Sequence, residues 1–146
     1  MRAISRGLYP PLLKQLGLTE SIEQLILEID EQTDLFVSGD IDKIDAFFNE
    51  DQTLNCYRFI QECIHNCIKH ANAKALSVSA LKLGNTIKIS IQDNGKGFDA
   101  TNAQKQNSLG LKTIYERIRI LKGELTIESK PNQGTIIIAK IPLKNG

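Results

Sequence analysis

The hydrophobic pattern of the chain changes its period near Ala73, and this change constrains the fold more than any other feature. Before it, apolar residues recur every three or four positions, as on one face of an α-helix. After it, apolar and polar residues alternate, as in strands with one buried face. With 146 residues, 41% of them hydrophobic, the chain is long enough for one core in which helices pack on a sheet.

The helical period predicts two helices before Ala73. Apolar residues place the first helix around residues 22–29, and the second runs from Glu50 to about Ala71. On the second helix, regular spacing puts one apolar face together, made of Cys56, Ile60, Cys63, Ile64, Cys67, Ile68 and Ala71. Between them, residues 35–37 predict a short strand, and Ser38-Gly39-Asp40 predicts the turn that ends it. Residues 40–49 are acidic, and we expect a solvated loop there.

The alternating period predicts two hairpins after Ala73, and helical spacing returns between them. The predicted elements are strands 76–80 and 87–91 around a Gly84-Asn85 turn, a helix 111–121 ended by Gly123, and strands 125–129 and 135–141 around a turn at 131–134. The order helix, helix, hairpin, helix, hairpin is typical of an α+β fold. We therefore predict a two-layer α/β sandwich, with one sheet and its helices on one face.

Composition excludes several classes of protein. The 18 basic and 17 acidic side chains nearly cancel, whereas nucleic-acid binders usually carry a basic surplus. No apolar stretch approaches the roughly 18 residues of a membrane helix, so we expect no direct membrane contact within this chain. Cys56, Cys63 and Cys67 share one face of the second helix, and an odd number of such residues favours free, buried thiols. We expect a cytoplasmic protein.

The polar face of the second helix carries the first candidate site. Glu62, Asn66 and Lys69 form one stripe on this face. An amide oxygen suits Mg²⁺, which binds few protein groups and completes its octahedron with phosphates and water. A carboxylate one turn away can accept a proton or hold a water, and a lysine can meet phosphate oxygens. A solvated helix face is the alternative interpretation.

A second candidate site is the Asp93-Asn94-Gly95-Lys96-Gly97-Phe98 run directly after a predicted strand. Its two glycines allow positive φ angles and a close approach of the backbone to a ligand. Asp93, at the buried end of the strand, can accept a hydrogen bond from an exocyclic amine. An ordinary turn would also explain this run.

The third candidate is Ser108-Leu109-Gly110-Leu111, at the start of the predicted third helix. Free amides and the helix dipole favour an anion there, such as a phosphate. Ser108 is equally suited to be an N-cap residue.

Together the three clusters resemble the sequence boxes of sensor histidine kinases. Residues 61–71 (Gln-Glu-Cys-Ile-His-Asn-Cys-Ile-Lys-His-Ala) resemble the N box, residues 93–98 the G1 box and residues 108–111 the G2 box. Gly134-Thr135 also lies where these kinases have a Gly-Thr pair. Order and spacing agree over residues 50–143, so the combined signal is more specific than any single box.

The start of the chain extends the resemblance. Residues 8–18 (Leu-Tyr-Pro-Pro-Leu-Leu-Lys-Gln-Leu-Gly-Leu) resemble the segment that leaves the dimerisation helices in the subfamily with double-proline linkers. Residues 1–17 are accordingly expected to be the end of a dimerisation helix and its linker, and residues 18–146 the catalytic domain. The implied fold is the Bergerat-type ATP-binding fold with a mixed sheet, shared with gyrase, MutL and a heat-shock chaperone.

Carried over by position, the resemblance implies a set of catalytic residues. Asn66 would be the Mg²⁺ ligand, and Glu62 the acid that polarises the metal-bound water or assists proton transfer. Lys69 and His70 would face phosphate oxygens. Ser108 stands where the G2 box usually has glycine, so lid closure is expected to differ.

The resemblance also implies how ATP would be bound. Asp93 would read the adenine amino group, Gly97 would allow close backbone approach, and Thr135 would add a hydroxyl. Residues 98–107 would be the ATP lid. The nucleotide-binding residues implied are Asn66, Lys69, His70, Asp93, Gly95, Gly97, Phe98, Leu109, Gly110, Leu111 and Thr135.

The implied function is transfer of the γ-phosphoryl group of ATP, with Mg²⁺, to a histidine. His65 and His70 lie within the N box and fit the acceptor role poorly. We therefore expect the acceptor on a dimerisation helix outside this sequence, and from there transfer to a response regulator. One alternative is an autonomous ATPase in which Glu62 activates water. Another is a nucleotide-sensing or partner-binding module without catalysis.

Overall fold

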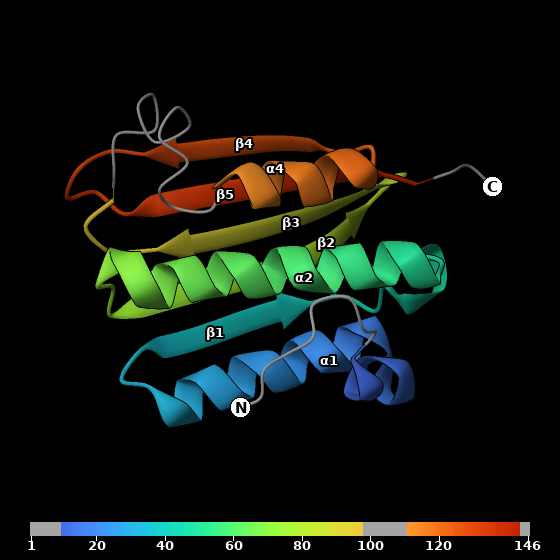
Figure 1. Cartoon of the computed structure of the whole chain (residues 1–146), viewed down its shortest axis with the longest axis horizontal. Helices are drawn as coiled ribbons and strands as arrows, with labels where there is room; N and C mark the ends of the chain where they lie inside the picture. Colours follow the sequence, from blue (N-terminus) through green and yellow to red (C-terminus); the bar gives the residue numbers. More distant parts are fainter. Residues whose placement is uncertain (1–9, 98–110, 144–146) are drawn as a thin grey trace.

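The computed structural model describes residues 10–97 and 111–143, which form a five-stranded mixed sheet with helices on one face (Figure 1). The elements are α1 (Pro11–Gln32), β1 (Phe36–Ile41), the 3₁₀ turn η1 (Asp45–Phe47), α2 (Glu50–Asn66), the π-helical turn η2 (Cys67–Ala71), β2 (Ala75–Leu83), β3 (Thr86–Asp93), α4 (Leu111–Ile120), β4 (Glu124–Ser129) and β5 (Thr135–Pro142).

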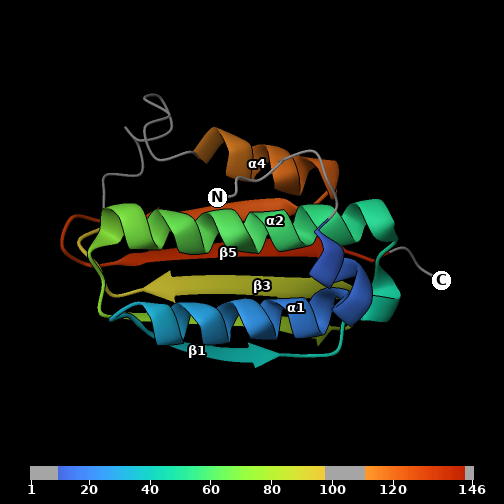
Figure 2. The same ribbon diagram turned by 60° about the horizontal axis from the view of Figure 1, so that its bottom comes forward.

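The strand order is β1-β2-β3-β5-β4, with β1 parallel to β2 and the other pairs antiparallel. Figures 1 and 2 show α1, α2 and α4 side by side over the same face of the sheet. The predicted α+β sandwich is therefore confirmed. None of the helices in these two described ranges has both the length and the hydropathy of a membrane-spanning segment.

The sheet forms where the alternating pattern predicts it. In β2 and β3 every second residue is buried, with exposed fractions of 3% or less: Leu76, Val78, Ala80, Ile87, Ile89 and Ile91. Gly84 turns the hairpin with φ of +63°. Strand β5 then inserts between β3 and β4, so that Asp93 pairs with Thr135 at the end of the ladder. This register brings together two residues that the sequence separates widely.

Helix α2 begins at Glu50, as predicted, because a capping box fixes its first turn. The Asn49 side chain accepts a hydrogen bond from the Gln52 amide at 2.8 Å, and Gln52 Oε1 accepts one from the Asn49 amide at 2.8 Å. Along the helix Cys56, Ile60 and Cys63 are almost fully buried. The apolar face of α2 is thus the central layer of the core.

The turn predicted at residues 38–40 is wrong. Strand β1 continues through these residues, and Gly39 and Asp40 pair with Val78 and Ser79 of β2. A Cβ atom on Gly39 would lie 2.6 Å from Cδ1 of Ile26 on α1. The glycine therefore allows α1 to pack closely on β1, and it carries no turn.

The solvated loop predicted for residues 40–49 is also wrong in part. Ile44 is fully buried, and Asp45 Oδ1 accepts a hydrogen bond from the Thr19 amide at 3.0 Å. Helix α1 is broken at Gly17, where φ is +83°, so the segment after Gly17 has free amides at its start. Asp45 serves these amides as an N-cap from a distant part of the chain. Partial burial raises the pKa of the Asp45 carboxyl, but hydrogen bonds from Thr19 and Leu18 outweigh it and leave the pKa below its ordinary value.

We expect Asp45→Ala to lower the free energy of unfolding by about 1 kcal/mol, the typical cost of losing an N-cap. Because the pKa of Asp45 is lowered in the folded state, its contribution is present above the ordinary carboxyl pKa and is lost as pH falls through the folded value. Urea denaturation at pH 7 and pH 3 measures both effects. Equal destabilisation at the two pH values would contradict the capping role.

Candidate functional site

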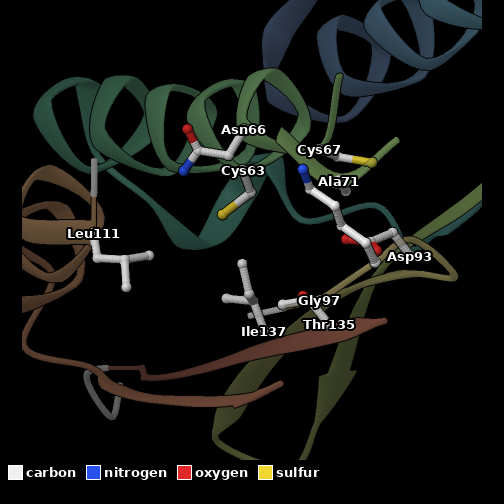
Figure 3. A pocket seen from close by; sticks show the side chains of 10 residues that line it. Cys63, Asn66, Cys67, Ala71, Asp93, Gly97, Leu111, Thr135 and Ile137 are labelled. Atoms are coloured by element: carbon white, nitrogen blue, oxygen red, sulfur yellow. The ribbon is translucent and has the colours of Figure 1, made fainter. Parts of the chain in front are cut away.

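A cavity of about 170 Å³ opens between the C-terminal end of α2, the loop after β3, the start of α4 and strand β5 (Figure 3). Its lining residues are Cys63, Asn66, Cys67, Ala71, Asp93, Lys96, Gly97, Leu111, Thr135 and Ile137. Five of the predicted nucleotide-binding residues line this one cavity: Asn66, Asp93, Gly97, Leu111 and Thr135. In Figure 3, Asn66 and Leu111 lie towards one end and Asp93 at the other.

Asp93 is the carboxylate of the cavity. Its Oδ1 accepts a hydrogen bond from the Gly95 amide at 2.8 Å, and the backbone amide of Thr135 also donates to the carboxylate. Burial nevertheless raises the pKa of Asp93 above its ordinary value, against the lowering effect of these two amides. The fold thus holds a partly desolvated acceptor against an otherwise mostly apolar wall.

The loop that follows Asp93 is fastened to its neighbours by side-chain and backbone hydrogen bonds. Asn94 Oδ1 accepts hydrogen bonds from the amides of Lys74 and Ala75, each at 2.9 Å. The Lys96 amide donates to the carbonyl oxygen of Ala71 at 2.7 Å, and the Lys96 carbonyl accepts from Asn132. The described part of this loop, residues 94–97, is therefore anchored between the end of α2 and the β4–β5 turn.

Gly95 and Gly97 are required here by space as well as by conformation. A Cβ on Gly95 would overlap the Ala71 carbonyl oxygen, and one on Gly97 would overlap that of Lys130. Gly97 also has φ of +64°. These backbone contacts explain why this turn needs glycine at both positions.

The end of α2 departs from the predicted regular helix. Residues Cys67–Ala71 form a π-helical turn, and Asn72 ends it with φ of +51°. The turn changes the helical register, so Ile68, predicted on the buried face, is 42% exposed. Cys67 and Ala71 remain buried and line the cavity. The prediction for Ile68 is wrong because it assumed 3.6 residues per turn throughout.

Within the polar stripe predicted on α2, Glu62 and Asn66 lie on the regular helix, and Lys69 lies in the π-helical turn. Asn66 lines the cavity, whereas Glu62 and Lys69 are not among the lining residues. Lys69 is exposed, and Glu62 forms an ion pair with Arg117 of α4. The assigned roles of these three residues stay predictions.

Several predicted site residues lie outside the described part of the chain. These are Phe98, Leu109 and Gly110, together with Ser108 and the lid assigned to residues 98–107; the side chain of His70 is likewise not described. Their roles also remain predictions.

Sequence reasoning missed half of the lining. Cys63, Cys67, Ala71 and Ile137 supply apolar walls, and Lys96 supplies an exposed cation. The cysteines were expected as free, buried thiols, and the structure confirms this. Burial raises the pKa of Cys67 to about 12, with a further rise from the charge of Asp93, so its thiol stays protonated at neutral pH.

The donor set of the cavity fits a magnesium ion of the kind that relies on phosphate. Among the residues that the structure describes, no three His, Cys, Asp or Glu side chains gather as a metal cluster. Asn66 offers one amide oxygen at the cavity wall. Mg²⁺ commonly takes one or two protein ligands and completes its shell with phosphates and water.

Residues 51–145 match the family described as histidine kinase-, DNA gyrase B-, and HSP90-like ATPase. The chain belongs to this family. Its curated relatives include signal transduction histidine-protein kinase/phosphatase DegS of Brevibacillus brevis, 36% identical over 98% of this chain and 37% of the relative. Sensor histidine kinase ComP of Bacillus subtilis (strain 168) is 34% identical over 91% of this chain and 17% of the relative. The chain thus spans less than two fifths of the length of either protein.

Solved structures of histidine kinases have the same fold as this ATPase domain. The blue-light activated histidine kinase of Erythrobacter litoralis EL346 superposes with a TM-score of 0.75, at 17% identity, over 90% of this chain and 43% of that one. Histidine kinase AdeS of Acinetobacter baumannii gives a TM-score of 0.69, at 19% identity, over 88% and 64%. At these identities the likeness establishes the fold alone.

Two glycines with nearly equal φ allow backbone strain and crowding to be separated. Gly84 has φ of +63° with nothing within 4 Å of an added Cβ, while Gly97 has φ of +64° and no space. We expect Gly84→Ala to cost about 1 kcal/mol of unfolding free energy, and Gly97→Ala roughly 1–3 kcal/mol more. Urea denaturation of both variants measures the difference. Equal costs would show that crowding at Gly97 is relieved without penalty.

Asp93→Asn tests the burial of the carboxylate. The pKa of Asp93 is higher in the folded state than in the unfolded state. The native chain is therefore most stable where Asp93 is protonated, and it loses stability as pH rises through the folded-state pKa. The amide keeps an acceptor for Gly95 and cannot ionise, so the variant should gain on the native chain as pH rises from 3 to 8. Thermal unfolding across this range measures the gap. If the native chain instead gained stability relative to Asp93→Asn as pH rises, the raised pKa of Asp93 would be contradicted.

Proposed function

We propose that the chain is the ATP-binding catalytic domain of a sensor histidine kinase. It binds ATP with Mg²⁺ and transfers the γ-phosphoryl group to a histidine on a separate dimerisation helix. The single observation that carries this proposal is the cavity, which has a partly desolvated acceptor, Asp93, at one end and the amide of Asn66 at the other. Membership in the ATPase family and the named relatives support the same reading.

The adenine end of the site follows from the chemistry of Asp93. A carboxylate held by two backbone amides presents its remaining acceptor positions to the cavity. An exocyclic amine of a purine is a matching donor, and Cys67, Ala71 and Ile137 provide apolar surface for a flat base. The Thr135 hydroxyl lies 2.8 Å from Ser129 Oγ, which fixes its orientation beside Asp93.

The phosphate end is assigned to Asn66, Glu62 and Lys69. A magnesium ion bound there would neutralise charge on the triphosphate. Asn66 would hold the ion, and Lys69 would meet phosphate oxygens from the exposed end of α2. In the transfer, a histidine nitrogen forms a bond to the γ-phosphorus as the bond from that phosphorus to the bridging oxygen of ADP breaks. Glu62 would accept the imidazole proton. Protein catalysis of such steps consists mainly of positioning and charge stabilisation.

The partners follow from this assignment. The acceptor belongs to histidine-bearing dimerisation helices, and a response regulator receives the phosphoryl group from them. Residues 1–17 are proposed as the link to those helices, and the break of α1 at Gly17 lies at the end of this segment.

Incubating the chain with labelled ATP, with and without a separate histidine-bearing helix pair, tests the proposal. We expect label on the helix only when the chain and Mg²⁺ are both present. Asn66→Ala should lower this transfer about a hundredfold, while calorimetric affinity for ATP without Mg²⁺ should change little. Asp93→Ala should instead abolish ATP binding with and without Mg²⁺.

The opposite outcomes are equally clear. Release of free phosphate from ATP at the same rate with and without the helix pair would indicate an autonomous ATPase. Binding of ATP with neither product would indicate a nucleotide-sensing module. If Asn66→Ala weakened binding equally with and without Mg²⁺, Asn66 would have a structural role. Unchanged affinity in Asp93→Ala would refute the adenine assignment.

A further inference from the structure

Glu62 is contacted by an arginine from the neighbouring helix. Arg117 Nε of α4 lies 3.6 Å from Glu62 Oε1 of α2. The two side chains are only 26% and 28% exposed, and both of these atoms are shielded from solvent. Coulomb attraction between charges so placed is screened less than at the open surface. The pair therefore restricts where the carboxylate can lie.

The arginine is itself held in place by a buried amide. Arg117 Nη1 donates to Asn55 Oδ1 at 3.2 Å, and Asn55 Nδ2 donates to the carbonyl oxygen of Asp51 at 3.0 Å. Asn55 is 8% exposed, and its amide orientation is fixed by this backbone contact. Two groups of the planar guanidinium are thus engaged at once, by Asn55 and by Glu62, which fixes its plane.

The location of the pair links it to the cavity. Glu62 lies one turn of α2 before Asn66, which lines the cavity, and Arg117 lies on the helix that begins at Leu111, another lining residue. Asn55 and Glu62 are two turns apart on the same side of α2. Arg117 therefore bridges the two helices beside the proposed phosphate end.

We propose that Arg117 is a positioning residue for Glu62. It holds the carboxylate in one orientation next to Asn66, so that Glu62 is ready to accept a proton during transfer. This inference rests on the proposed function, because it assigns the support of a residue that the function uses. Arg117 acts through Glu62 and needs no contact with ATP.

Measuring the rate of phosphoryl transfer together with the affinity for ATP tests this role. In Arg117→Met we expect phosphoryl transfer to fall about tenfold to a hundredfold, the size of effect seen when a catalytic group is misplaced. ATP affinity should stay within about twofold, because Arg117 does not line the cavity. Arg117→Lys keeps the charge but replaces the planar guanidinium with a single ammonium group, which holds Glu62 less firmly, so it should retain an intermediate rate.

A double-mutant cycle separates positioning from general damage. Added to Glu62→Gln, Arg117→Met should cause little further loss of rate, because the group that it positions is already gone. Arg119→Met is the matched control. Arg119 lies on the same helix, is exposed and pairs with Glu116, so this variant should keep the native rate. Thermal unfolding of every variant monitors folding.

Nuclear magnetic resonance of the arginine Nε–Hε group gives a readout without activity. In the native chain the Arg117 Hε should exchange slowly with water, and Glu62→Gln and Asn55→Ala should each accelerate this exchange. Rapid native exchange, or exchange unaffected by Glu62→Gln, would overturn the inference. The inference would also be overturned if Arg117→Met transferred phosphoryl groups at the native rate. It would equally be overturned if Arg117→Met lowered the transfer rate by the same factor in the native and Glu62→Gln backgrounds. A native chain that shows protected Hε but transfers no phosphoryl group would instead refute the proposed function.

Discussion

The pairing of β3 with β5 is the interaction on which the cavity depends. Strand β3 contributes three buried isoleucines to the core and carries Asp93 at its end. The antiparallel register sets Thr135 directly beside Asp93, so that a backbone amide of β5 supports the carboxylate. A shift of one residue in this register would turn the side chains of β5 to the other face and remove that support.

Some of this arrangement could be predicted because it depends on the local pattern of apolar and polar residues. The alternation in β2 and β3, the turn at Gly84 and the start of α2 at Glu50 each follow from neighbouring residues. Residue type and position indicated Asn66 and Asp93 as candidates, the family resemblance added Thr135, and all three line one cavity. Their individual roles remain proposals.

The features that sequence reasoning missed depend on distant contacts. Gly39 indicates a turn by composition, but its missing side chain makes room for Ile26 of a helix. The cap from Asp45 reaches Thr19 across 26 positions. The π-helical turn after Asn66 has no reliable local signal, although it sets which side chains of α2 reach the cavity. These three features depend on tertiary packing, which cannot be inferred from a single sequence.

The two walls of the cavity differ in how far apart in the sequence the residues that fasten them lie. The contacts of the loop after β3 with Lys74 and Ala75 close around a short hairpin, so they join residues about 20 positions apart. The contact between Asp93 and Thr135 closes a much longer loop and carries a larger entropic cost. One wall of the cavity therefore belongs to a local unit, while the other is completed only by the last strand. Loss of β5 would accordingly remove the backbone amide that supports Asp93, and with it Ile137, Ala139 and Ile141, which are buried in the same core as α2.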